Sequence, residues 1–319
     1  MGDRPGSQCS ASYSGGCDGN LDRRSHNVIG TNSTGIQAEN RGFGNASVDA
    51  SGNISGNAGA AGFTLLGIKA GAGSIGSFDQ TGDASVIYRS GTINLVGASF
   101  DAGIFATAPG SAKITTLSGT SITVSKEFSS DIAQGGIEAF SDNGATTVIA
   151  ASKITVNGNG NPMADFRSQP VGIQVQSDLG GSAPVTYTGP GITVHGGGGL
   201  GIAAVSGSQD AATTNGSVTV NASGPINADG PDAVGILADS GTLRNTIRGR
   251  PITLMTGQLQ VTASNVSTQG EFGTAISAKG GSGGVAVNIP SGGSIMGGWQ
   301  ATPFTTPATP LLPGRPLLP

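Results

Sequence analysis

Short runs that alternate apolar and small polar residues recur along the chain, separated by turns rich in glycine and asparagine. Residues 135–160, GGIEAFSDNGATTVIAASKITVNGNG, contain three such runs in succession. Alternation with a period of two is typical of half-buried strands, and it places Ile137 and Ala139 on one face and Glu138 on the other. Asparagine and glycine favour turns. The stretch therefore predicts three short strands joined by two corners, with inward side chains at Ile137, Val148, Ile154 and Val156.

The first run, Gly-Ile-x-Ala, has relatives from one end of the chain to the other. Its copies begin 29 to 40 residues apart, at Gly35, Gly67, Gly103, Gly136, Gly172, Gly201, Gly235 and, in degenerate form, Ala275. Most units contain two further alternating runs, such as Ser217-Val218-Thr219-Val220 and Pro225-Ile226-Asn227-Ala228. A fixed period of this length is the signature of a repeat architecture.

Three strands in each unit of about 34 residues predict an all-β solenoid, a single parallel β-helix of about eight coils. Helical repeats of similar length need sustained 3.6-residue periodicity, which frequent glycines interrupt here. We expect an irregular segment or cap over residues 1–30, β-helix repeats over 31–300 and a disordered Pro-rich tail over 301–319. Within the repeats, the irregular span 241–272 predicts an insertion that leaves the coil.

The composition supports this fold class and limits the partners. Glycine accounts for 57 of 319 residues, charged residues for 11%, and the net charge is −4. Phosphate binding needs clustered Lys and Arg, so nucleic acid is not an expected partner. No window approaches eighteen apolar residues, and we expect no membrane-spanning segment. Cys9 and Cys17 allow two interpretations, free thiols or a small-loop disulfide in an oxidising compartment.

The tail ATPFTTPATPLLPGRPLLP has five prolines at a strict three-residue spacing, which would place them on one edge of a polyproline II segment. A disordered tail or linker is the favoured interpretation. A ligand for a proline-reading module is the alternative.

Several patterns that could signal chemistry are weak here. Gly71–Gly76 has the dinucleotide-binding spacing but lacks the helix that must follow, and Gly280–Gly284 has nucleophile-elbow spacing within a glycine-rich stretch. His195 is interpreted as an outer or turn residue after Ile192-Thr193-Val194, with no carboxylate that the sequence pairs with it. The residue at the position of Glu138 differs from copy to copy, which indicates a variable outer face. We therefore predict no enzyme, no catalytic, cofactor-binding or metal-binding residues, and no cofactor.

The Gly-Ile-x-Ala, Ser-Val-Thr-Val-like and x-Ile-Thr-Val-like runs resemble the passenger regions of autotransporters, the self-exported surface proteins of Gram-negative bacteria (type V secretion). The resemblance covers about residues 30–298. It implies a right-handed parallel β-helix at the cell surface or secreted from it. Neither a signal peptide nor a translocator barrel is recognised in the sequence. We therefore expect a passenger fragment, a truncated frame, or a part whose exporter is encoded separately.

Three functional hypotheses follow. The first is a non-catalytic, adhesin-like or structural stalk that contacts host or bacterial surface glycans or proteins, or associates with itself. The second is a polysaccharide-active β-helix, lyase-like or hydrolase-like, which needs two converging carboxylates near Arg or Lys. The third is a truncated autotransporter remnant with no function.

Overall fold

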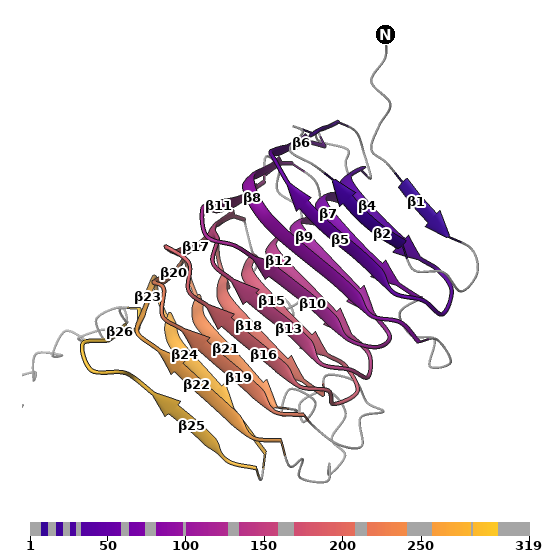
Figure 1. Ribbon diagram of the computed structural model, residues 1–319. Helices are drawn as coiled ribbons and strands as arrows, with labels where there is room; N and C mark the ends of the chain where they lie inside the picture. The colour runs from indigo at the N-terminus through magenta and orange to yellow at the C-terminus, as the bar shows by residue number, and fades with distance from the viewer. Residues whose placement is uncertain are drawn as a thin grey trace, which may run out of the picture.

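The computed structural model is all-β, and every regular element in the residues that it describes is a strand (Figure 1). Within the part of the chain that the structure describes, no helix is long and apolar enough to cross a membrane. The described residues are 8–11, 17–21, 26–29, 33–58, 64–73, 81–97, 100–126, 134–158, 169–207, 216–240, 257–281 and 283–298.

The first of three parallel sheets, called sheet A, contains the Gly-Ile-x-Ala copies. Its nine described strands are β1 (Gln8–Ala11), β4 (Ser33–Asn40), β7 (Thr64–Ala72), β9 (Phe100–Ala108), β12 (Gln134–Ser141), β15 (Val171–Ser177), β18 (Leu200–Ser206), β21 (Val234–Ser240) and β24 (Thr274–Lys279). Each strand pairs in parallel with the strand of the next unit. The isoleucines of all eight copies align in one column, from Ile36 to Ile276.

Sheets B and C are built from the second and third runs of the units. Sheet B contains β2 (Cys17–Leu21), β5 (Ala46–Ser51), β8 (Ala84–Val96), β10 (Ala112–Thr116), β13 (Thr146–Ala150), β16 (Ala183–Tyr187), β19 (Val218–Ala222), β22 (Leu259–Ala263) and β25 (Val285–Asn288). Sheet C contains β3 (His26–Ile29), β6 (Ile54–Asn57), β11 (Thr120–Ser125), β14 (Lys153–Asn157), β17 (Ile192–His195), β20 (Ile226–Asp229), β23 (Asn265–Gln269) and β26 (Ser294–Met296).

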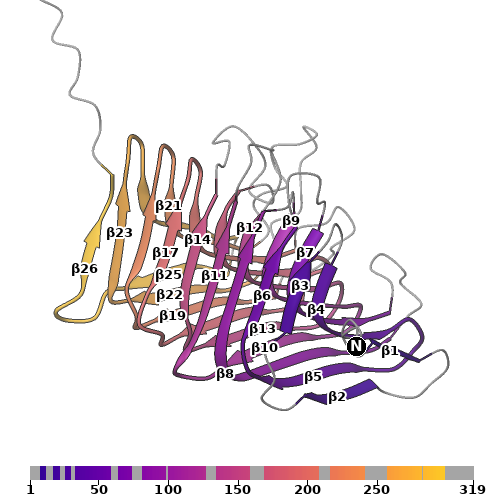
Figure 2. The ribbon, with the colours of Figure 1, turned by 90° about the horizontal axis from the view of Figure 1, so that it is seen from above.

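The single long strand β8 belongs to both sheets, pairing through its first half with β5 and β10 and through its second half with β6 and β11. Figures 1 and 2 show the strands of each sheet lying side by side along the stack. Parallel strands in stacked sheets are consistent with a solenoid such as a β-helix, and the predicted repeat is confirmed.

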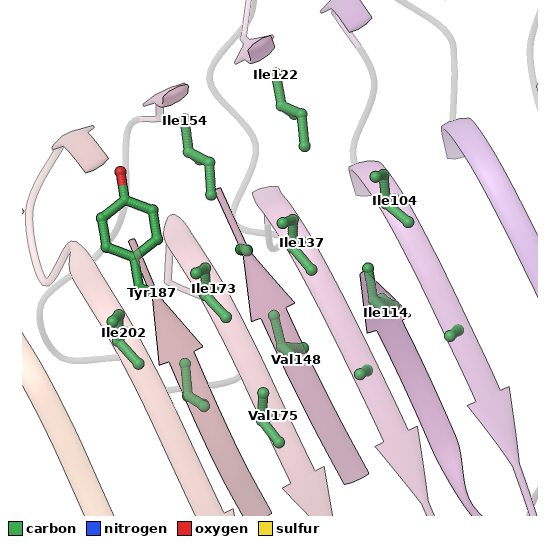
Figure 3. Close-up of a cluster of buried hydrophobic side chains, with 14 of the residues drawn as sticks. Ile104, Ile114, Ile122, Ile137, Val148, Ile154, Ile173, Val175, Tyr187 and Ile202 are labelled. Carbon is green, nitrogen blue, oxygen red and sulfur yellow. The ribbon is translucent and has the colours of Figure 1, made fainter. Parts of the chain in front are cut away.

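The core lies between the sheets and consists of columns of inward side chains (Figure 3). Ile137, Val148, Ile154 and Val156 are fully buried, as the alternation predicts. Tyr187 is also buried, and its hydroxyl accepts a hydrogen bond from the backbone N–H of Gly191 at 2.8 Å, which satisfies a polar group at a corner.

The glycine of Gly-Ile-x-Ala is required by close packing. At the seven copies that have it, an added Cβ would lie 2.4–2.7 Å from a carbonyl oxygen in the next strand of sheet A. It would also lie 2.3–2.9 Å from a methyl group of an isoleucine or valine in sheet C. The degenerate copy places Ala275 in β24, which has no following strand among the described residues. Among the described residues, no carbonyl oxygen of a following sheet A strand therefore lies against the Cβ of Ala275.

The described part of residues 1–30 contains three strands. β1, β2 and β3 pair in parallel with β4, β5 and β6. The described sheets therefore include part of the predicted 1–30 segment, and its role as a cap stays a prediction. The predicted insertion over 241–272 is wrong from residue 257 onward. There the chain stays in the sheets, because β22 and β23 pair in register with β19 and β20. Residues 241–256 and the Pro-rich tail over 301–319 lie outside the described residues.

We expect Gly172→Ala to lower the free energy of unfolding by about 3 kcal/mol, at the upper end of the cost of overpacking a core. The added methyl would lie 2.4 Å from Cγ2 of Ile192 and 2.5 Å from the carbonyl oxygen of Gly201, and backbone cannot move away cheaply. Gly71→Ala is the matched control in the same sheet, because its new contacts are 3.6–3.8 Å. Chemical denaturation measures both, and equal losses would contradict this explanation of the motif.

Candidate functional site

The outer face of sheet C has two in-register rows of polar side chains, here called the polar ladder. One row is Thr123, Thr155, Thr193, Asn227 and Ser267, and the other is Ser125, Asn157, His195, Asp229 and Gln269. All ten are partly or fully exposed, and they alternate with buried residues that are apolar except for Thr268. Adjacent strands lie about 4.8 Å apart, so the ladder offers donors and acceptors at a regular spacing.

Hydrogen bonds join neighbouring members of the polar ladder. The amide of Asn157 donates to Oγ of Ser125 at 2.9 Å, and Oγ of Ser267 donates to Oδ1 of Asn227 at 2.5 Å. Such cross-strand contacts stabilise a sheet surface while their remaining groups stay available to solvent or a ligand. The outward threonine of the x-Ile-Thr-Val runs is the sequence signal for this polar surface, which was not predicted.

His195 ends β17 on the outer side, as the sequence predicts, but it has a carboxylate partner. Its Nδ1 lies 2.5 Å from Oδ2 of Asp229, with exposed side-chain fractions of 47% and 40%. The prediction that His195 has no carboxylate partner is therefore wrong. The two residues occupy equivalent positions of successive units, so the repeat length alone could have identified them. An exposed pair of this kind stabilises a protein by less than about 1 kcal/mol.

The outer face of sheet A varies from copy to copy, as predicted, but on its central strands it is not the exposed side of half-buried strands. Glu138 is only 1% exposed, and its register neighbours Gln174, Ala203 and Leu237 are buried as well. Val171, Leu200, Ala203 and Leu237 form a second apolar cluster apart from the main core. The central strands of sheet A are thus buried on both faces, which alternation within one strand cannot reveal.

The side chain of Glu138 lies in register between Phe105 and Gln174. It folds back over Gly135, where an added Cβ would be 2.0 Å from Oε1 of Glu138. Its register neighbour Phe105 packs edge-on to Phe100 at a centroid distance of 6.0 Å and tilted against Phe140 at 5.6 Å. Within the described chain, Oε1 of Glu138 is buried without a hydrogen-bond partner.

Burial controls the protonation of this region. Desolvation, and then repulsion from Asp101, raise the pKa of Glu138 to about 8, so the carboxyl is protonated at neutral pH. Desolvation raises the pKa of Asp101 to about 7, opposed by the charge of Lys126 and a hydrogen bond with the Leu65 backbone. Two buried acids, Glu138 and Asp101, therefore interact electrostatically, and Asp101 also interacts with Lys126. This arrangement was not predicted from the sequence.

The other carboxylates of the repeats differ in their exposure. Asp142, Asp178 and Asp239 are buried, whereas Asp232 is exposed. Residues 74–76 and 282, which belong to the two glycine-rich motifs, lie outside the described residues, as do Asp131, Asp165 and Asp210. Among the described residues, no group of three or more His, Cys, Asp or Glu side chains could hold a metal ion.

Comparison with known proteins gives no relative. No protein-family model matches the chain, and no curated protein and no solved structure matches it.

We expect the free energy of unfolding to fall as the pH rises from about 4.5 to 8. The raised pKa values mean that the folded chain binds more protons than the unfolded chain in this window, so rising pH favours unfolding. Glu138→Gln should remove part of this pH-dependent loss of stability. We expect the variant to exceed the wild type by about 2–4 kcal/mol at pH 8, with a much smaller difference at pH 4.

Denaturant titrations at pH 4, 6 and 8 measure this difference. The control is Asp232→Asn, which changes an exposed side chain. A gain from Glu138→Gln that is the same at pH 4 and pH 8 would show that the buried carboxyl does not titrate in this window.

Proposed function

We propose that the chain is a non-catalytic, right-handed parallel β-helix of about eight coils, related to autotransporter passengers, that is displayed at or secreted from the cell surface. It acts as an adhesive stalk whose polar ladder on sheet C binds surface glycans. Right-handed connection is the rule for parallel strands joined by a crossover, which supports the proposed hand.

The observation that carries the proposal is the contrast between inner and outer positions of sheet C. Inner positions are isoleucine or valine except for Ala228 and Thr268, whereas the outer positions form ten aligned polar side chains over five strands. Hydroxyl, amide, imidazole and carboxylate groups supply the donors and acceptors that sugar hydroxyls require. Contacts repeated from strand to strand add up along one extended ligand or several linked ones, which raises the overall affinity without any single strong site.

The test is binding of the full chain to an array of bacterial and mammalian cell-surface glycans. We expect Thr123→Val, Thr155→Val and Thr193→Val together to reduce binding at least tenfold, because they remove three hydroxyls while keeping the β-branched shape. The matched control is Thr115→Val, Thr147→Val and Thr186→Val on the outer face of sheet B, where the threonines are similarly half-buried.

Thermal unfolding of both triple variants shows whether the fold is retained. Absence of binding by the wild type to every glycan, or equal loss in the two triple variants, would refute the role of the polar ladder.

A second candidate function, polysaccharide cleavage, is favoured by the neighbourhood of Glu138. A protonated acid next to Asp101 and beside Phe105 resembles the acid pair and sugar-stacking ring that glycosidases use. The near-complete burial of both carboxyl groups opposes it, because a substrate would have to displace whatever covers them. Release of reducing sugar from bacterial polysaccharides by the wild type, lost in Glu138→Gln, would favour this function over adhesion.

A further inference from the structure

The C-terminal end of the stack leaves inward side chains uncovered. Among the described strands, β24, β25 and β26 each pair on one side only. Val285 and Val287 of β25 are 46% and 48% exposed, whereas their register neighbours Leu259 and Val261 in β22 are 2% and 0% exposed. The same two columns that form the core elsewhere therefore reach solvent here.

The surrounding residues extend this apolar surface. Ile289 is 38% exposed, Met296 of β26 is 57% exposed, and Ile295 is partly buried against the core. We call Val285, Val287, Ile289, Ile295, Met296 and the nearby Phe272 the end face. An exposed apolar cluster of this kind, bordered by unpaired strand edges, is a typical site of protein association.

Phe272 is the most unusual member of the end face. It is 60% exposed and has a φ of 60°, in the left-handed region that bulky residues rarely adopt. The equivalent corners of the two preceding units have Asp232 and Gly198 at φ values of 56° and 67°, which fit this conformation better. The backbone N–H of Gly198 donates to the carbonyl oxygen of Pro231, and that of Asp232 donates to the carbonyl oxygen of Glu271. These hydrogen bonds align the three corners. Glycine adopts this conformation at no steric cost, and a partner that covers the exposed ring would account for an aromatic residue here.

The charges that flank β24 favour an antiparallel partner. Glu271 precedes the strand and Lys279 ends it, and both are exposed. If a second β24 lay antiparallel to the first over its full length, Lys279 of each copy would lie opposite Thr274 of the other, next to the corner that contains Glu271. Opposite charges across a strand pair are stabilising, and like charges are destabilising.

We propose that the end face binds the end face of a second copy of this chain across a twofold axis, which gives a closed dimer. The contact is self-complementary, because apolar residues meet apolar residues and Lys279 of each copy lies near Glu271 of the other. A twofold contact uses up the exposed edge on both copies, so assembly stops at two. This inference goes beyond the proposed glycan binding, since it concerns a different surface and a different partner.

The mass of the full chain over a range of concentrations tests the proposal, measured by analytical ultracentrifugation. We expect a monomer–dimer equilibrium for the wild type and at least a tenfold weaker dimer for Val287→Lys. The matched control is Ala286→Lys, the next residue of the same strand, whose register neighbour Gln260 is on the outer side. A wild-type monomer at all concentrations, growth beyond a dimer, or equal weakening by both variants would overturn the proposal.

A charge exchange tests the antiparallel geometry. Glu271→Lys alone and Lys279→Glu alone should each weaken the dimer, because like charges then lie near each other. The variant with both substitutions should regain the wild-type dimer. Failure of the double variant to regain it, while the single variants are weakened, would overturn the antiparallel arrangement.

Hydrogen exchange distinguishes a second copy from another segment of the same chain, such as residues 299–319. Protection of the β25 and β26 amides should rise with protein concentration if a second copy covers them. Protection that is independent of concentration would mean that the chain covers its own end, and it would overturn the proposal.

Discussion

Hydrogen bonding between the same backbone positions of successive units is the interaction on which the rest of the structure depends. Because each strand of sheet A pairs in register with the next, equivalent side chains fall into columns, and the column from Ile36 to Ile276 is the clearest. A column accepts only side chains that fit above and below one another. The glycine next to this column follows from the same constraint, because carbonyl oxygens of sheet A and methyl groups of sheet C leave no room for a Cβ.

The interior was predictable from sequence because two local signals agree. Alternation identified Ile137, Val148 and Ile154 as inward residues, and the repeat length aligned them with their counterparts. What surrounds the outside of a strand is not a local property. Glu138 sits opposite Ile137 in the pleat, as predicted, yet it is buried, because other parts of the molecule decide whether that face meets water. The His195–Asp229 pair lies between these cases, since one repeat length separates the two residues.

The outer faces of sheets A and C present different environments to a ligand. On sheet C the polar side chains remain hydrated and bond to one another along the stack. On the central strands of sheet A, the acid Glu138 and an apolar cluster are removed from water, so the acid is stabilised in its neutral form. A single repeating unit thus supports a hydrated polar surface and a dry, proton-holding one, because only the inward positions must stay similar from unit to unit for the stack to form.

The direction of the backbone hydrogen bonds has a mechanical consequence. In parallel sheets these bonds run between strands, and here that direction is the long direction of the stack. A force that pulls the two ends apart acts on the layers of bonds in series, so the weakest layer opens first and its neighbours stay closed. Each released unit of about 34 residues then adds roughly 110 Å of extended chain. A molecule built in this way yields to tension in discrete steps, and it absorbs work at each step instead of failing as a whole.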